Sequence, residues 1–251
     1  MTFVRGSLLI GAFMLVCSAF AAHAADLWRG GSSMKDGGYR PAITTNPTWY
    51  ARLDTAYAAH DDPIMVEESR FDLYDRAWDS TWTLGGGFGR YFTSHIRGDI
   101  TWDYRFESDA RGTVQANCCN GEREFGISSH VLLANLYYDF NRRGRINPYI
   151  GIVLGTTYNE TSENTKPGDC GCTVSIASGD SWHVAGAFMA GVSMKLRKRL
   201  TFHMGYRFLY LGDVRTGRLT QVGNGSHVAT HVSAEDLHAH ELRLGLRYDI
   251  R

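Results

Sequence analysis

One short stretch of the chain alternates strictly between two kinds of side chain. In the segment IRGDITWDYRF, residues 96–106, one parity is apolar and ends in three aromatic rings, whereas the other carries Arg97, Asp99, Asp103 and Arg105. Successive side chains of a β-strand point to opposite faces of a sheet, so the segment predicts a strand with one apolar and one charged face. The pattern alone does not decide which face looks inward.

The same alternation recurs along most of the 251 residues. Strands are expected at 48–58, 81–91, 96–106, 128–140, 148–158, 181–194, 200–211 and 238–250. Their connections alternate between long (59–80, 107–127, 159–180 and 212–237) and short (92–95, 141–147 and 195–199). Long loops at one end and tight turns at the other are typical of outer-membrane barrels. The sequence therefore predicts an all-β fold, an eight-stranded antiparallel up-and-down transmembrane β-barrel with short periplasmic turns and long extracellular loops.

The charged strand residues gather on one parity, and the opposite parity is free of charge apart from Arg90 beside a turn. The charged set is Arg52, Asp54, Arg97, Asp99, Asp103, Arg105, Asp139, Arg207, Glu241, Arg243, Arg247 and Asp249. A charge that faces hydrocarbon near the bilayer midplane costs about 2–4 kcal/mol, whereas confined arginines pair with carboxylates. We therefore expect these charges to form a network in the lumen, where Gly85, Gly87 and Gly89 leave room for arginine side chains.

The N-terminal segment is typical of a secretory signal. Arg5 precedes an apolar run over 8–20, and Ala22-His23-Ala24 is an A-x-A cleavage site. We expect residues 1–24 to be removed as a signal peptide, 25–47 to form a flexible periplasmic lead-in, and 48–251 to form the outer-membrane barrel. This organisation predicts export to the outer membrane of a Gram-negative bacterium.

Several strand segments also carry a family resemblance. They read LLANLYYDF, NPYIGIVLG, WHVAGAFMAGVSMKL, LTFHMGYRFLYLGD and HELRLGLRYDI. These segments resemble the OmpA/OmpX-type outer-membrane β-barrel family, particularly the small porin-like surface proteins of alphaproteobacteria, over roughly residues 48–250. The resemblance implies outer-membrane lipid and lipopolysaccharide as surroundings and the barrel-insertion machinery as a partner. It does not fix an activity, because one fold hosts many functions.

The expected width of the barrel bears on function. Eight strands enclose an interior about wide enough for its own side chains to fill. Our first hypothesis is therefore a structural, surface-exposed protein that contributes to envelope integrity, with loops that contact host, phage or protein ligands. The alternative is a small porin passing ions or small solutes, motivated by the polar lumen and by the porin-like relatives. The 26 basic and 26 acidic residues balance, so no nucleic-acid partner is expected.

A lipid A-modifying enzyme ranks third. A nucleophile needs a base within hydrogen-bond reach and an orienting carboxylate. His231 and Ser233, with Glu235 or Glu241, supply these residue types, but the predicted loop is a poor support for a rigid constellation. We expect no catalytic residue.

Histidines crowd the last predicted loop and the start of the final strand, at His227, His231, His238 and His240. Imidazole rings can bind zinc or copper, but this spacing matches no compact metal motif. We interpret the cluster as part of a solvated loop. Neither a metal nor a cofactor is expected.

Four cysteines lie in two long loops that would be neighbours on the barrel, at Cys118, Cys119, Cys170 and Cys172. The periplasm and the cell surface are oxidising, which favours disulfides, and four cysteines allow three connectivities. Bridges between vicinal or near-vicinal cysteines would be strained, so cross-loop bridges are the preferred hypothesis. A metal site and free or locally paired thiols are the alternatives.

Overall fold

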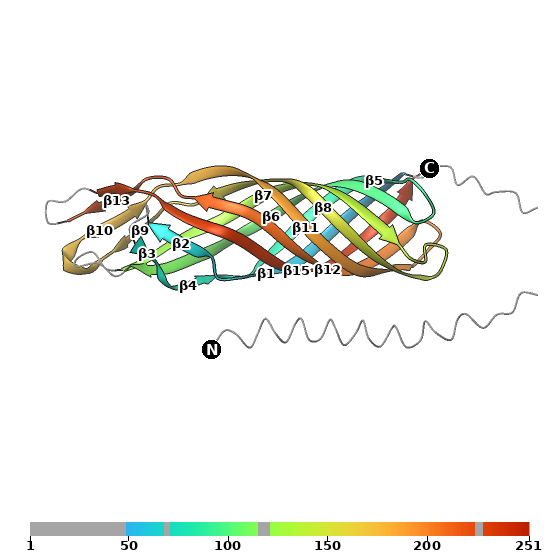
Figure 1. Ribbon diagram of the computed structural model, residues 1–251, viewed down its shortest axis with the longest axis horizontal. Helices are drawn as coiled ribbons and strands as arrows, with labels where there is room; N and C mark the ends of the chain where they lie inside the picture. The colour runs from blue at the N-terminus through green and yellow to red at the C-terminus, as the bar shows by residue number, and fades with distance from the viewer. Residues whose placement is uncertain (1–48, 68–70, 115–120, 224–227, 251) are drawn as a thin grey trace, which may run out of the picture. The chain divides into compact units, whose positions relative to one another are not determined.

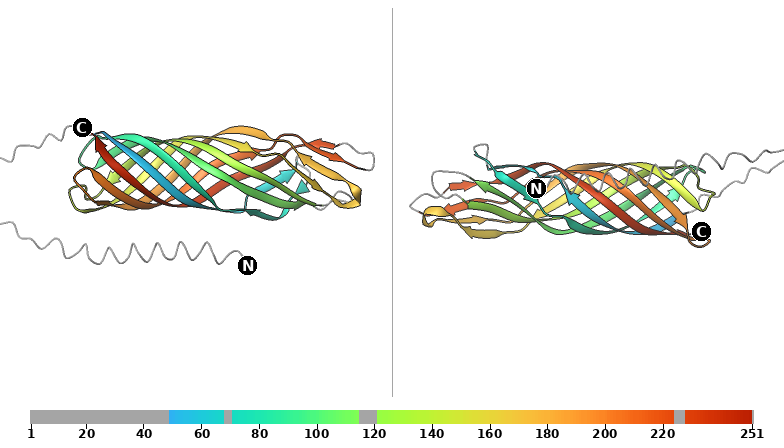
Figure 2. Two further views of the ribbon diagram at one scale, coloured as in Figure 1. Left: turned by 180° about the vertical axis from the view of Figure 1, so that it is seen from behind. Right: turned by 90° about the horizontal axis from the view of Figure 1, so that it is seen from below.

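A closed ring of long antiparallel strands dominates the computed structural model, which describes residues 49–67, 71–114, 121–223 and 228–250. In ring order the strands are β1 (Trp49–His60), β5 (Thr81–Tyr91), β6 (Ile96–Val114), β7 (Gly121–Asp139), β8 (Ile146–Thr161), β11 (Gly179–Lys195), β12 (Leu200–Arg215) and β15 (Val232–Ile250). Pairing of β1 with β15 closes the ring (Figures 1 and 2). The predicted eight-stranded up-and-down barrel is confirmed. The predicted signal peptide and lead-in lie outside the described residues.

The two ends of the barrel differ in their connections. At the end that we call the turn end, short connections follow β5, β7 and β11, and Phe92 and Leu196 each donate a backbone hydrogen bond of 2.9 Å across their turns. At the opposite end lie β2 (Ile64–Glu67), β3 (Phe71–Asp72), β4 (Tyr74–Trp78), β9 (Asn164–Pro167), the 3-10 turn η2 (Asp169–Gly171), β10 (Thr173–Ile176), β13 (Leu219–Val222) and β14 (Val228–Thr230) (Figure 1). Within the described ranges, no helix is both long and apolar enough to cross a membrane.

We call the end opposite the turn end the outer end. The predicted bounds of the long loops there are wrong, because several barrel strands continue into the predicted loops. β6 runs to Val114, β7 begins at Gly121, and β15 begins at Val232. β2 pairs with β15, β4 pairs with β6, and β9, β10, β13 and β14 form a separate four-stranded sheet. Much of what the sequence predicts as loop is therefore hydrogen-bonded sheet.

Local irregularities explain why the alternation in the sequence stops early. The pairing register of β6 shifts between Arg105 and Ser108, and the register of β12 shifts around Gly212. Asp236 of β15, which adjoins the partner of Gly212 in this pairing, has a φ of 55°. A bulge sets two residues of one strand against one of its partner. The parity that faces inward therefore changes at each of these points, and a strict alternation cannot be followed through them.

The apolar parity covers the outside of the ring. Leu53, Phe88 and Ile100 are 61%, 67% and 62% exposed. Exposed aromatic rings gather near the turn end (Trp49, Phe92, Tyr138, Phe140 and Tyr248) and farther along the strands (Tyr57, Trp82, Trp102, Phe106 and Trp182). The stretch from Trp49 to Tyr57 on β1 is close to the ~9–11 residues with which a tilted strand crosses a bilayer. Such rings favour the membrane interface.

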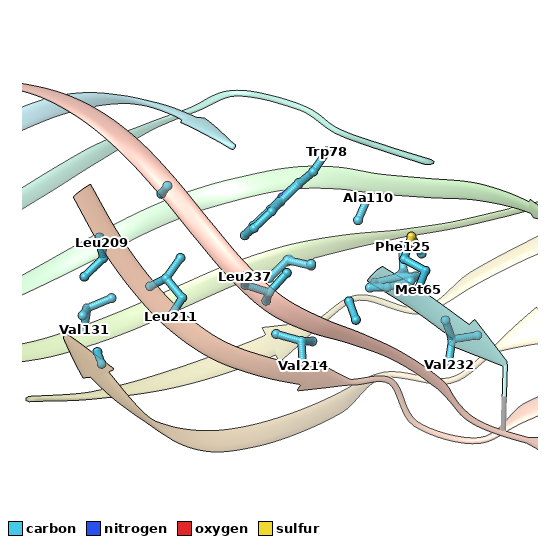
Figure 3. Close-up of a cluster of buried hydrophobic side chains, with 14 of the residues drawn as sticks. Met65, Trp78, Ala110, Phe125, Val131, Leu209, Leu211, Val214, Val232 and Leu237 are labelled. Carbon is cyan, nitrogen blue, oxygen red and sulfur yellow. The ribbon is translucent and has the colours of Figure 1, made fainter. Parts of the chain in front are cut away.

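The interior is divided into two layers. Nearer the turn end the inward side chains are mostly charged or polar. Farther along, many of them are apolar and form a buried cluster beside polar groups such as the Arg123–Glu67 ion pair. We call this cluster the apolar plug and define it as Met65, Trp78, Ala110, Val131, Phe125, Leu209, Leu211, Val214, Val232 and Leu237 (Figure 3). The plug begins beside the charged layer, since Val131 lies opposite Asp103 in the pairing of β6 with β7.

Candidate functional site

The middle of the barrel interior is crossed by ion pairs. Arg207 of β12 places Nη2 2.9 Å from Oδ2 of Asp103 on β6, and Nε 2.6 Å from Oε2 of Glu241 on β15. Arg243 of β15 places Nη1 2.8 Å from the same Asp103 oxygen. Arg105 pairs with the other oxygen of Glu241. Because β6 and β12 lie on opposite sides of the ring, these contacts span the lumen.

A second group of pairs is centred on β1. Arg52 forms a bidentate contact with Asp54, with Nε to Oδ2 at 2.7 Å and Nη2 to Oδ1 at 2.8 Å. Its Nη1 also lies 3.0 Å from Asp99 Oδ2 on β6. His203 of β12 contacts Asp54 at 2.5 Å. Asp54 also lies 3.7 Å from Arg243, so the two groups form one connected network.

Closer to the turn end, Arg97 of β6 extends this network. It lies 3.2 Å from Asp139 on β7 and 3.7 Å from Asp99. Its guanidinium carbon sits 3.6 Å from the ring centroid of Tyr137. Tyr50 donates a hydrogen bond of 2.9 Å to Asp99, which also accepts one of 2.7 Å from the Asn135 amide. Paired charges whose remaining polar atoms are hydrogen-bonded can be held in a low-dielectric interior.

The structure brings together ten of the twelve charges that the sequence assigns to the lumen. Arg247 and Asp249 are placed differently. Asp249 accepts a hydrogen bond of 3.1 Å from the Tyr91 hydroxyl. Arg247 is buried, and within the described ranges it forms no ion pair. Its guanidinium instead lies over the rings of Tyr50 and Tyr91, at 5.4 and 5.5 Å from their centroids.

Sequence reasoning from charge missed the neutral members of the site. Tyr50, Tyr137, Asn135 and His203 are all buried and bonded to the network. Each stands on the inward parity of its strand, as the charged residues do. The alternation therefore indicates that these neutral residues face inward, but charge alone does not identify them as members of the site.

The strand glycines make room for other groups than expected. A Cβ on Gly85 would collide with the Asp103 carboxylate, and one on Gly89 would collide with the Tyr50 ring and Asp99. A Cβ on Gly87 would meet the backbone of β6 and Thr101. The glycines thus give space to the Asp103 carboxylate, the Tyr50 ring, the Cβ of Asp99 and the backbone of β6, and the expectation that they accommodate arginine is wrong.

The residue types that suggested an enzyme are not linked to one another. The Ser233 hydroxyl donates to the Val66 carbonyl at 3.5 Å, and the His231 ring contacts the Thr216 carbonyl at 3.3 Å. Glu241 is engaged by arginines in the lumen. Within the described ranges, no hydrogen bond joins Ser233, His231 and a carboxylate into a relay.

The predicted histidine cluster is divided between a connection and the last strand, as its predicted bounds imply. His238 and His240 belong to strand β15. Their rings lie 5.3 and 5.1 Å from the Phe208 centroid, and the Tyr206 hydroxyl is 2.5 Å from His240 Nδ1. These two histidines are therefore part of an aromatic face of the barrel, and the interpretation as a solvated loop is wrong for them, whereas His231 lies in the connection between β14 and β15. His227 lies outside the described residues.

The cysteine prediction can be followed at one position. Cys172 is buried and has an interaction partner. Cys118 and Cys119 lie outside the described residues, as does the side chain of Cys170. The cross-loop pairing stays a prediction.

Comparison with known proteins identifies a family whose model matches this chain. Residues 12–249 match the family model described as the outer membrane protein beta-barrel domain. An uncharacterized protein of Brucella abortus is 28% identical over 246 residues, covering 81% of this chain and 85% of the relative. Among solved structures, Neisserial surface protein A is 15% identical with a TM-score of 0.45, covering 81% of this chain and 98% of its own. OprG from Pseudomonas aeruginosa is 18% identical with a TM-score of 0.49, at 80% and 95% coverage.

Proposed function

The chain belongs to the outer membrane protein β-barrel family, and on that premise we propose that it is a structural, surface-exposed protein of the outer membrane. In this proposal the barrel contributes to envelope integrity, and its outer end makes contacts with host, phage or protein ligands. One observation carries the proposal, namely that the lumen is filled by paired charges and closed by the apolar plug.

The charge network supports a closed lumen. An ion that moved along the axis would have to separate pairs such as Arg207 with Asp103, whose side chains are each 1% exposed. Removing one partner of a buried pair typically costs about 3–5 kcal/mol. The same contacts join strands that are not neighbours in the ring, so they stabilise the wall that they block.

The apolar plug supports the same conclusion independently. Phe125, Leu209, Leu211 and Leu237 are at most 1% exposed. Apolar constrictions in channels exclude water and thereby stop ions. A path through the barrel would therefore have to pass a charged barrier and then a dry one.

The structure of the outer end supports the proposed contacts with host, phage or protein ligands. Strands β6, β7, β12 and β15 continue past the ring of exposed aromatic residues, and short strands enlarge the sheet there. This outer extension carries ion pairs at its surface, such as Lys166 with Glu122 at 3.0 Å. A structured, polar extension beyond the membrane is a suitable surface for ligands.

A small porin is the second candidate. It is favoured by a cavity of about 480 Å³ at the turn end. This cavity is polar space at one end of the interior that the charge network does not fill. The porin hypothesis requires that the network and the plug open together.

Planar-bilayer conductance of the full chain discriminates between the two candidates. The structural proposal predicts no sustained open-channel steps, even at high protein loading. A gel that compares unboiled with boiled protein verifies that the same sample is folded, so silence cannot result from unfolded chains. Sustained steps from folded protein would contradict the structural proposal and support the porin.

The proposal also includes the processing and partners expected from the sequence. Residues 1–24 would be cleaved as a signal peptide, 25–47 would form the periplasmic lead-in, and the insertion machinery would deliver the barrel to lipid and lipopolysaccharide. An outer-membrane fraction whose protein begins at Ala25 would support this order. A mature protein that retains the first residues would contradict it.

A further inference from the structure

A basic cavity opens at the turn end of the barrel. Its volume of about 480 Å³ lies within the ~300–1,000 Å³ that is usual for small-molecule sites. Asp249 is the acidic residue among those that line it, and the basic ones are Arg142, Arg145, Lys195, Arg197, Lys198 and Arg247. Side chains from two different turns and from the end of β15 thus converge on one space with a large excess of positive charge.

Arg247 is the most unusual member of this cavity. It is 4% exposed, and its Nε has no hydrogen-bond partner within the described part of the chain. The other arginines of the predicted lumen set each have a carboxylate within 4.0 Å. Asp249 lines the same cavity, but its carboxylate accepts from Tyr91 and forms no ion pair with Arg247.

Neighbouring contacts fix further cations around this space. The Arg142 guanidinium carbon lies 3.5 Å from the ring centroid of Tyr91, the ring that Arg247 also approaches. Arg142 is held by donating a hydrogen bond of 3.0 Å to the Thr93 carbonyl, and Lys195 donates one of 3.4 Å to the Arg143 carbonyl. Positive groups are therefore positioned in advance of any ligand.

An anion bound in the cavity would compensate the positive charge of Arg247 and its basic neighbours. A buried cation without a partner is costly, and contact with aromatic faces offsets only part of that cost. An arginine together with a lysine is a combination suited to phosphate, because the guanidinium binds oxygen atoms in a bidentate manner and the ammonium acts as a point charge. The cavity also has room for a substituent on such a group.

We infer that the turn-end cavity is a binding site for a phosphate group, contacted by Arg247 and flanked by Arg142 and Lys195. The phosphate can come from a free anion in the periplasm or from the headgroup of a phospholipid in the adjacent leaflet. The inference rests on the fold and its orientation in the membrane. It does not depend on whether the lumen conducts.

Calorimetric titration of the folded full chain, in a neutral detergent and a phosphate-free buffer, tests this inference. One arm uses inorganic phosphate, and the other uses short-chain phosphatidylglycerol below its micelle concentration. We expect saturable binding in at least one arm, and the responding arm identifies the source. Arg247→Gln and Arg142→Gln should each weaken binding roughly tenfold or more, as expected for loss of a charge-assisted hydrogen bond.

Arg143→Gln is the matched control, because Arg143 lies in the same turn as Arg142 but does not line the cavity. It should weaken binding less than about threefold, as expected for an exposed charge. If Arg247→Gln fails to fold, the inference is tested by comparing the loss of phosphate binding in Arg142→Gln with that in Arg143→Gln. The inference is overturned if folded wild-type protein binds neither probe. Equal losses in Arg142→Gln and Arg143→Gln, or binding of succinate as tight as that of phosphate, also overturn it.

Discussion

Arg207 of β12 and Asp103 of β6 form an ion pair across the barrel, with 2.9 Å between Nη2 and Oδ2. Their strands lie on opposite sides of the ring, and the residues are 104 positions apart in the chain. Asp103 also receives Arg243 from β15 at 2.8 Å. One carboxylate therefore connects three strands through the lumen, and the network depends on it.

Substitution of Asp103 by asparagine tests this dependence. Asp103→Asn keeps the shape of the side chain but leaves Arg207 and Arg243 without the charge that they share. We expect the free energy of unfolding, measured by urea titration in lipid vesicles, to fall by about 3–5 kcal/mol. Asp79→Asn is the control, since its pair with Arg111 has side chains 48% and 42% exposed and should be worth at most about 1 kcal/mol. Similar losses for both variants would show that the lumen pair is not special.

Two alanine substitutions at strand glycines distinguish the effect of a steric clash in the lumen from the general effect of replacing glycine in a strand. A Cβ on Gly85 would collide with the Asp103 carboxylate and lie 2.9 Å from the Trp102 carbonyl oxygen. One on Gly186 would meet nothing closer than 3.9 Å. Gly85→Ala should therefore lower the free energy of unfolding by about 1–3 kcal/mol, whereas Gly186→Ala should be neutral or gain up to about 1 kcal/mol. Unfolding curves of the two variants that coincide would refute this difference.

The sequence predicts the membrane-spanning part of the barrel because a single physical rule operates there. Lipid requires an uncharged outer face, so alternation is strict from Ile96 to Phe106 and in the corresponding parts of the other strands. Beyond Phe106 the outer face meets water, and a bulge costs little. The register shift before Ser108 and the left-handed Asp236 then reverse the inward parity, which hides the outer strands from a search for alternation.

The candidate site could be predicted only in part for a similar reason. Parity identifies which side chains face inward, but it does not tell which of them meet across the lumen. Arg247 and Arg243 stand on the same face of β15, yet Arg243 reaches Asp103 and Arg247 reaches two tyrosine rings. Which partner each side chain finds depends on the tilt and stagger of the strands. Ala110, Val214 and Val232 of the apolar plug lie beyond the register shifts and Asp236, where the alternation of the membrane-spanning part no longer identifies inward residues.

The cysteines of the outer end give a chemical prediction. We expect cross-loop bridges that join Cys118 or Cys119 to Cys170 or Cys172, because the cell surface is oxidising. Intact mass after alkylation should therefore show no free thiol before reduction and four afterwards, and digestion should yield peptides linking the two regions. Four alkylated thiols in the unreduced, exported protein would contradict the prediction.

The orientation of the two barrel faces is the central claim, and photo-crosslinking to lipid tests it most directly. Benzoylphenylalanine in place of Leu53, midway between Trp49 and Tyr57 on β1, should form phospholipid adducts in vesicles, visible as added mass. The same label in place of Val222, an exposed apolar residue of β13 in the outer extension, should form none. Adducts at Leu53 alone are the predicted result. No lipid adduct at Leu53, or equal yields at both positions, would contradict the account.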